Sequence, residues 1–251
     1  MRWVVIRAFL ILGFVSVPRH QVSGASDETT ASTLIPLEAM AGTNLTLVRG
    51  VTDHYTLRRE YAPKEFQARL AVFEYLLDHL DVCSVLAQMA SLIQYRAHLD
   101  ADGRLYADDR AGAAGYILKV YAGEGKRIFY VEGTEHGVFD VHGRGVVVLD
   151  YRATAGGRIE YTRAVFVKVD NVVLAALAQL FEVFLRGTVD RHFAHVIRNP
   201  IILSEQVERD PQRLLDQIGR LPEADQQLSL PFAALVRSNA SARLADNSRS
   251  P

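Results

Sequence analysis

Cysteine, tryptophan and methionine are scarce in this sequence, and its charges almost cancel. The chain has 251 residues with one Cys, one Trp and three Met, and its formal net charge is −1. A single cysteine forms no intramolecular disulfide, so packing alone must stabilise the fold. Because the charge is balanced and no run of Lys and Arg is long, nucleic acid is not expected as a partner. The length is ample for a hydrophobic core in one large domain or two small ones.

Sequence motifs for cofactors and catalysis are also missing. No GxGxxG, Walker loop or HExxH occurs in the sequence, so no cofactor is expected and no catalytic residue is assigned. Cys83 lies in an apolar helical pattern, where the role of a small buried hydrophobic residue is favoured. The alternative is a catalytic thiol, for which His79, one helical turn away, is the nearest partner in the sequence.

The first 25 residues have the pattern of a signal peptide. Arg2 and Arg7 precede an apolar stretch at 8–17, and the small residues at 23–25 match a cleavage site. We therefore expect a mature protein that begins near Ser26 and is secreted or periplasmic. An uncleaved N-terminal anchor is the alternative, and membrane contact is expected only through that segment. Residues 26–47 are mostly small and polar, and are expected to form an N-terminal arm.

Residues 48–92 predict a strand followed by two helices. The alternation at 51–61 favours the strand, and Pro63 is in a position to open the first helix. An apolar side chain then recurs every three or four positions, as on one face of a helix, at Phe66, Leu70, Phe73, Leu77 and Leu80. Asp81 is the expected N-cap of the second helix, so the helical stretch breaks near "DHLD".

Six short runs rich in Tyr, Val, Ile and Phe follow, separated by turn sequences such as "DADG", "GEGK" and "TAGG". Short connections imply antiparallel neighbours, so the runs predict an antiparallel meander and not parallel βαβ units. They are "IQYRAHL", "RLYADD", "GYILKVYA", "RIFYVEGT", "VFDVHGRGVVVLDYRAT" and "RIEYTRAVFVKVD".

A long, strongly apolar helix is predicted at 170–199 and is ended by Pro200. Its most apolar part, 172–185, contains Gln179 and Glu182, and is shorter than the roughly 20 residues that a membrane span needs. A core helix and the lid of an apolar cavity remain as alternatives, because each buries such a helix on most sides. Residues 200–251 are expected to form a helical and polar tail that is loosely packed.

This order of elements resembles the helix-grip fold of the START and Bet v 1-like (SRPBCC) superfamily. The resemblance covers residues 48–199, with "VTDHYTLRREY" as first strand, "APKEFQARLAVFEYLLDHLDVCSVLAQ" as helix pair and "VDNVVLAALAQLFEVFLRGTVDRHFAHVI" as closing helix. It implies an α+β fold in which a curved antiparallel sheet of about seven strands grips the long C-terminal helix. It also implies an apolar cavity between sheet and helix. The candidate lining residues are Phe66, Leu70, Phe73, Leu77, Leu174, Leu177, Phe181, Phe184 and Leu185.

Two groups of histidines were weighed as candidate sites. The first group is His136, Asp140 and His142, which have the same strand parity. Histidine and aspartate are zinc ligands, but Gly137 places His136 in a turn. A solvated strand edge is therefore favoured, and no metal is expected. His192 and His195 are neighbours at i, i+3 on the predicted closing helix, where an exposed or capping role is favoured.

Charged residues within the apolar strands form two further pairs. Asp150 shares a face with Arg152, and Lys168 shares a face with Asp170. If that face lined the cavity, the charges would have to pair and would be able to orient a polar ligand group. A solvated, outward face is favoured. Three tyrosines in the same strands are expected in the core, namely Tyr121, Tyr151 and Tyr161.

Three functions are compatible with these features. The first is a secreted or periplasmic binding protein for a hydrophobic small molecule or lipid. The second is an enzyme, cyclase- or hydrolase-like, on the same scaffold, with Tyr55, Arg96 or Asp150 as candidate groups. It requires at least two titratable side chains to converge in one pocket. The third is an interaction or structural protein of the cell envelope with a filled core and a binding tail.

Overall fold

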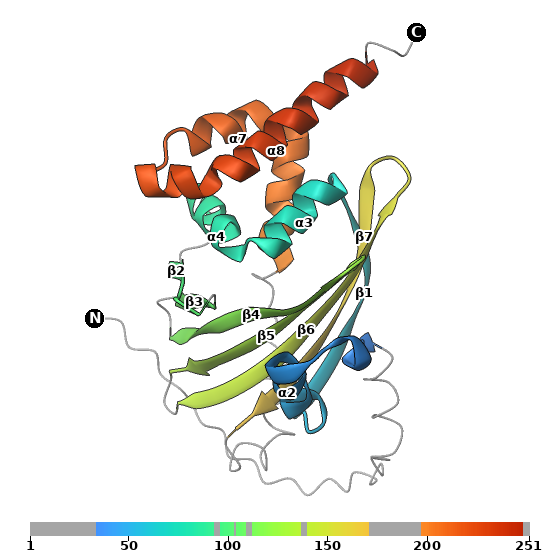
Figure 1. Ribbon diagram of the computed structural model, residues 1–251, viewed down its shortest axis with the longest axis vertical. Helices are drawn as coiled ribbons and strands as arrows, with labels where there is room; N and C mark the ends of the chain where they lie inside the picture. The colour runs from blue at the N-terminus through green and yellow to red at the C-terminus, as the bar shows by residue number, and fades with distance from the viewer. Residues whose placement is uncertain are drawn as a thin grey trace, which may run out of the picture.

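The computed structural model describes residues 34–92, 96–102, 104–108, 112–136, 140–170 and 197–247 (Figure 1). The protein is α+β, with a curved seven-stranded antiparallel sheet and C-terminal helices, an arrangement consistent with a helix-grip fold. The predicted signal peptide and most of the predicted closing helix, with His192 and His195, lie outside the described residues.

The seven strands follow the order β1-β7-β6-β5-β4-β3-β2 across the sheet, and every neighbouring pair is antiparallel. This confirms the meander predicted from the short turns. Positive φ angles at Gly125, Gly156 and Gly157 close the two longest hairpins, where side chains with a Cβ are strained. The strands are Leu57–Gln67 (β1), Arg96–Leu99 (β2), Leu105–Asp108 (β3), Ala113–Gly123 (β4), Lys126–Glu135 (β5), Val141–Thr154 (β6) and Arg158–Val169 (β7).

The first strand lies further along the chain than predicted. Residues predicted as its beginning form the end of helix α2, Gly42–Thr52, which also crosses the predicted boundary of the polar arm at residue 47. Pro63 lies inside β1, where the pairing with β7 shifts between Tyr61 and Lys64. Because β1 is an edge strand with a bulge at this point, the missing N–H of proline costs no ladder bond. The predicted helix start at Pro63 is therefore wrong.

The helix pair agrees with the sequence prediction once its start is corrected. Helix α3 spans Leu70–Asp78 and α4 spans Leu80–Met89, so the break falls within "DHLD" as predicted. His79, and not Asp81, occupies the N-cap position of α4. Cys83 is buried within α4, with 2% of its surface exposed. Burial, the larger cause, and the nearby charge of Asp81 both raise the pKa of its thiol. A thiol that stays protonated acts as a hydrophobic residue.

Each face of the sheet packs against a different helix. The face that packs against α3, called here the α3 face, contributes Phe129, Val147, Leu149 and Val165 to one core cluster. The opposite α2 face packs against α2 and the short helix η1 (Leu37–Ala39). Its core cluster contains Ile35, Met40, Val48, Val51, Ile128, Val146, Val148 and Phe166. The sheet therefore has two apolar faces.

The C-terminal residues form a packed helical layer with α3 and α4 beyond one end of the sheet (Figure 1). Residues 197–209 are helical, so the predicted helix end at Pro200 is wrong, and α7 (Pro211–Ile218) and α8 (Glu223–Asn247) follow. Asp210 caps α7, because its carboxylate accepts a hydrogen bond of 3.0 Å from the Arg213 N–H. The prediction of a loosely packed tail is wrong, since Phe232 and Val236 are fully buried. None of the described helices is long and apolar enough to cross a membrane.

Candidate functional site

The structure brings four of the nine predicted lining residues into one cluster. Phe66 comes from β1, and Leu70, Phe73 and Leu77 come from α3. Phe66 and Phe73 meet edge to face with ring centroids 4.9 Å apart. Phe73 and Leu77 are fully buried, whereas Leu70 stays partly exposed. The five other lining candidates, at 174–185, lie outside the described residues, so their role in a cavity stays a prediction.

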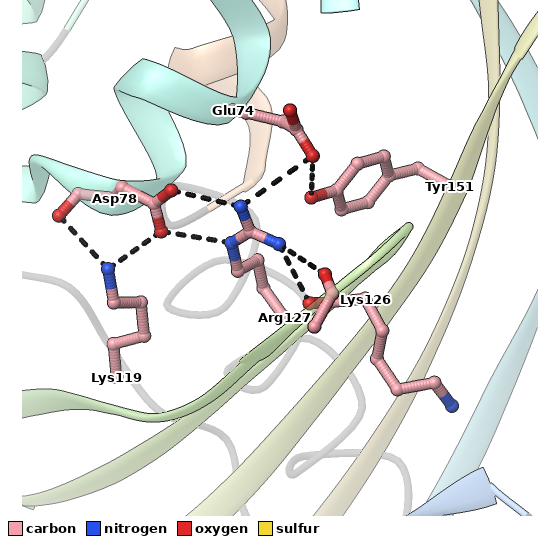
Figure 2. Close-up of polar contacts among 7 residues, drawn as sticks. Glu74, Asp78, Lys119, Lys126, Arg127 and Tyr151 are labelled. Carbon is pink, nitrogen blue, oxygen red and sulfur yellow. Dashed lines mark hydrogen bonds and ion pairs between the residues drawn. The ribbon is translucent and has the colours of Figure 1, made fainter. Parts of the chain in front are cut away.

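An ionic network next to this cluster connects α3 to the sheet (Figure 2). Arg127 of β5 donates from Nε and Nη2 to the two carboxylate oxygens of Asp78, both at 2.9 Å. Its Nη1 donates to the carbonyl oxygens of Gly123 and Lys126 at 2.6 and 3.0 Å. Nη2 also lies 3.6 Å from Glu74 Oε1. The guanidinium has five N–H groups, so these contacts leave it no donor for a ligand.

Lys119 and Tyr151 complete the network on either side of Arg127. Lys119 donates to Asp78 Oδ1 at 2.7 Å, and the Tyr151 hydroxyl donates to Glu74 Oε1 at 2.9 Å. Burial raises the pKa of Asp78, but the hydrogen bonds and charges of Arg127 and Lys119 outweigh it, and the pKa is lowered. The pKa of Tyr151 is raised mainly by burial and then by its hydrogen bond to Glu74. The network thus holds α3 on the sheet through a charged Asp78 and a Tyr151 hydroxyl that stays protonated.

The sequence contained a signal for this network that the sequence analysis missed. Arg127 alternates with Phe129 and Val131 in β5, so strand parity alone places a cation on the same face as two apolar residues. A buried cation requires a partner. Glu74 and Asp78 are four residues apart on α3 and supply it, because i, i+4 side chains share one face of a helix.

A second arginine lies in the same row of the α3 face. The pairing across the sheet aligns Tyr61, Arg163, Leu149 and Arg127, which belong to β1, β7, β6 and β5. The guanidinium carbon of Arg163 lies 3.7 Å from the ring centroid of Tyr61. Arg59, also on β1, approaches the same ring at 5.0 Å. The row therefore contains one arginine held by carboxylates and one held against an aromatic ring.

Beyond this row, away from α3, the central strands of the α3 face carry apolar residues and then no side chains. The next row contains Val165, Val147 and Phe129, with Arg59 of β1 and Lys119 of β4 at its two ends. The row after it contains Val167, Gly145, Val131 and Ile117. In the row after them, Gly143, Gly133 and Gly115 are direct neighbours on three adjacent strands. A Cβ on Gly115 would lie 2.2 Å from the Glu132 carbonyl oxygen. The strands approach closely here, and this strip of the α3 face, called here the glycine row, carries no side chains on β4, β5 and β6.

The charged pairs predicted in the strands lie on the α2 face. Asp150 pairs with Lys126 at 2.9 Å, and Arg152 pairs with Glu160 at 3.0 Å. Lys168 donates to the carbonyl oxygen of Gly50 in α2 at 2.8 Å. Asp170 bonds to Arg144. The pairs therefore lie on the face opposite α3. The solvated position favoured from the sequence holds only in part, because Arg152 is exposed whereas α2 covers Lys168.

The other sequence candidates do not meet in one place. Tyr151 and Tyr161 pack in the α3-face cluster, whereas Tyr121 packs in the α2-face cluster. Tyr55 packs edge to face against Phe166 on the α2 face at 5.7 Å. Asp150 is on that face as well, and Arg96 begins β2 at the far edge of the sheet. The residues suggested for an enzyme therefore do not converge.

The histidine cluster separates into two local contacts. His136 Nδ1 lies 3.0 Å from Asp140 Oδ1, and His142 Nδ1 lies 2.8 Å from Thr134 Oγ1. His136 and Asp140 are both well exposed. Within the ranges that the structure describes, no three His, Cys, Asp or Glu side chains gather around a position suited to a metal.

Comparisons with known proteins give matches of overall shape alone. No family model matches the chain, and no curated protein matches it. A conserved protein from Geobacillus kaustophilus is 13% identical, with a TM-score of 0.45 over 60% of this chain and 96% of the other. A hypothetical protein from Helicobacter pylori is 9% identical, with a TM-score of 0.37 over 78% and 99%. Truncated norcoclaurine synthase from Thalictrum flavum is 11% identical, with a TM-score of 0.39 over 61% and 95%.

Proposed function

We propose that this protein is a member of the START and Bet v 1-like superfamily that binds a hydrophobic small molecule or lipid. The ligand lies against the α3 face of the sheet. The observation that carries the proposal is the row of Gly143, Gly133 and Gly115 on that face. These residues leave the backbone without side chains next to a sheet surface made of Val and Ile. The apolar sequence at 172–185 also supports the proposal.

The chemistry of the α3 face supports an apolar ligand. Beyond the row of Arg163, the residues on β6 and β7 at this face are Val147, Gly145, Gly143, Val165, Val167 and Val169. Such a surface offers no hydrogen bonds from side chains, so it favours molecules that gain from leaving water. Burial of apolar ligand surface there contributes roughly 25 cal/mol per Å².

A pair of adjacent substitutions on β6 tests the proposal. A Cβ added at Gly143 meets only the Lys168 carbonyl oxygen, at an ordinary 3.6 Å, so Gly143→Leu places a bulky side chain on the glycine row with little backbone strain. We expect uptake of a fluorescent long-chain lipid to weaken by about tenfold or more, equal to 1.4 kcal/mol per tenfold. His142→Leu is the control, because it adds the same side chain at the next residue, on the opposite, exposed face.

Two outcomes would contradict the binding function. The first is a wild-type protein that takes up no lipid from a mixed extract. The second is equal weakening by Gly143→Leu and His142→Leu, which would mean that the ligand does not lie at the glycine row of the α3 face. Circular dichroism and urea unfolding of both variants show whether each keeps the wild-type fold.

The location outside the cytoplasm is part of the same proposal. It is supported by the charged, apolar and small-residue regions within the first 25 residues. N-terminal sequencing of the protein from its own host tests it, and we expect a mature end near Ser26. An intact Met1 on a protein recovered from the cytoplasmic fraction would contradict it.

A further inference from the structure

Arg163 differs from four other arginines of the sheet in its lack of a carboxylate partner. Arg127, Arg144, Arg152 and Arg158 each pair with an acidic side chain. In the described part of the chain, the side chain of Arg163 makes no hydrogen bond or ion pair, and it contacts the Tyr61 ring at 3.7 Å. Its side chain is nevertheless partly buried on the α3 face, between Tyr61 and Leu149 in the pairing.

The contact with Tyr61 leaves the hydrogen-bonding capacity of Arg163 unused. A cation above a ring face is attracted by the π electrons, and this contact does not consume the N–H groups of the guanidinium. Partial burial makes unused donors costly unless water or a ligand satisfies them. A planar guanidinium offers two parallel N–H groups whose spacing matches the two oxygens of a carboxylate.

A tyrosine ring, an arginine and a carboxylate lie around Arg163. The guanidinium of Arg59 approaches the Tyr61 ring at 5.0 Å. Burial raises the pKa of Tyr161, two residues along β7, and the charge of Arg163 acts in the opposite direction. Glu205 also acts on Tyr161 through its charge, but among the described residues it forms no ion pair with Arg163. The guanidinium of Arg163 itself therefore supplies the charge that complements an anionic group.

The position of Arg163 gives such a ligand a direction. Arg163 lies at the end of the apolar rows nearest α3, and Val169 lies six residues further along β7, beside the glycine row. At roughly 3.4 Å per strand residue these ends are about 20 Å apart. An anionic group at Arg163 therefore lets an extended alkyl chain follow β7 over valines and reach the glycine row.

We infer that the ligand of the α3 face is a long-chain carboxylate, a fatty acid or its equivalent, and that Arg163 binds the carboxylate. This inference rests on the proposed function and specifies its ligand class. Tyr61 is a positioning residue, because its ring holds the guanidinium. A neutral alcohol of the same chain length uses the same apolar rows but gains little from Arg163.

The test compares hexadecanoate with hexadecanol on the full chain and two variants, by direct titration. We expect Arg163→Gln to weaken hexadecanoate roughly ten- to hundredfold and to leave hexadecanol within about twofold. Arg152→Gln is the matched control, since it removes an exposed arginine from the neighbouring strand on the α2 face. It is expected to change neither affinity. Arg163→Lys keeps the charge without the planar fork and should retain part of the preference for the carboxylate.

The outcomes separate the inference from the proposed function. A wild-type protein that binds neither compound contradicts both. A wild-type protein that binds both equally, or an Arg163→Gln variant that binds hexadecanoate like the wild type, contradicts the assignment of Arg163 and leaves the apolar site standing. Equal loss of both ligands in Arg163→Gln also overturns the inference, because it shows a packing role. If Arg163→Gln fails to fold, the ratio of the two ligands in Arg163→Lys decides.

Discussion

Arg127 and Arg163 occupy the same row of the same sheet face, one strand apart across Leu149, and their surroundings differ completely. Arg127 faces two carboxylates and two carbonyl oxygens. Arg163 faces a tyrosine ring. The comparison teaches that a charge on an apolar sheet face has two distinct uses. At Arg127 the protein itself satisfies every donor and the result is structure, whereas at Arg163 the donors are left for another molecule.

The largest difference is expected in stability. Arg127→Ala removes the guanidinium shared by Glu74 and Asp78, which then keep only Tyr151 and Lys119 as partners, and breaking a buried pair in this way costs about 3–5 kcal/mol. Since Asp78 and Glu74 retain some contact with water, we expect the lower end of that range. Arg163→Ala should change the free energy of unfolding by less than about 1 kcal/mol, because it removes one cation–π contact. Urea unfolding of the two variants measures both values, and equal losses would contradict the distinction.

The network should also dominate the acid dependence of stability. The pKa of Asp78 in the folded protein is lowered from 3.8, so its contribution to stability is present above that value. It is lost as the pH falls through the lower folded pKa, because protonation then favours the unfolded chain. Asp78→Asn should flatten this loss below about pH 4. Unfolding at a series of pH values checks this, and an unchanged acid limb in the variant would show that other carboxylates cause it.

The smallest effect is expected at the edge of the network. Tyr151→Phe removes the hydroxyl that donates to Glu74 and keeps the ring that packs against Phe73 at 5.4 Å. The loss should be about 1–2 kcal/mol, as for one hydrogen bond to a charged acceptor. Tyr161→Phe is the matched variant, because it removes the hydroxyl and keeps the ring of the tyrosine that pairs with Tyr151 on the adjacent strand, on the same face. A loss in Tyr161→Phe equal to that in Tyr151→Phe would mean that the bond to Glu74 adds nothing specific.

The sheet was readable from the sequence because its determinants are local. Alternating apolar residues and glycine-rich turns predicted β2 to β7 within a few residues, including the antiparallel pairing. The strand that failed, β1, depends on context: Pro63 is compatible with a strand only because β1 is an edge strand with a bulge. Helix α8 failed for a related reason, since the short apolar run around Phe232 gains its stability from α3 and α4.

The candidate site was less predictable than the fold. Apolar periodicity placed Phe73 and Leu77 in the core, because burial follows the hydrophobic stripe of a helix. The difference between Arg127 and Arg163 depends on which side chains of other elements reach each guanidinium. Strand parity places both arginines on one face, but only the contact between β5 and α3 shows that the hydrogen-bond donors of Arg127 have protein partners. Such contacts join residues far apart in the sequence, so a single sequence does not show them.

The most direct test of the central claim is native mass spectrometry of the mature protein purified from its own host, with lipid extraction in parallel. The account predicts a stoichiometric apolar adduct that carries a carboxylate, which is lost from Gly143→Leu and retained in His142→Leu. A bare mass, together with no uptake from an added lipid mixture, would contradict it and would mean that the α3 face is filled by the protein alone.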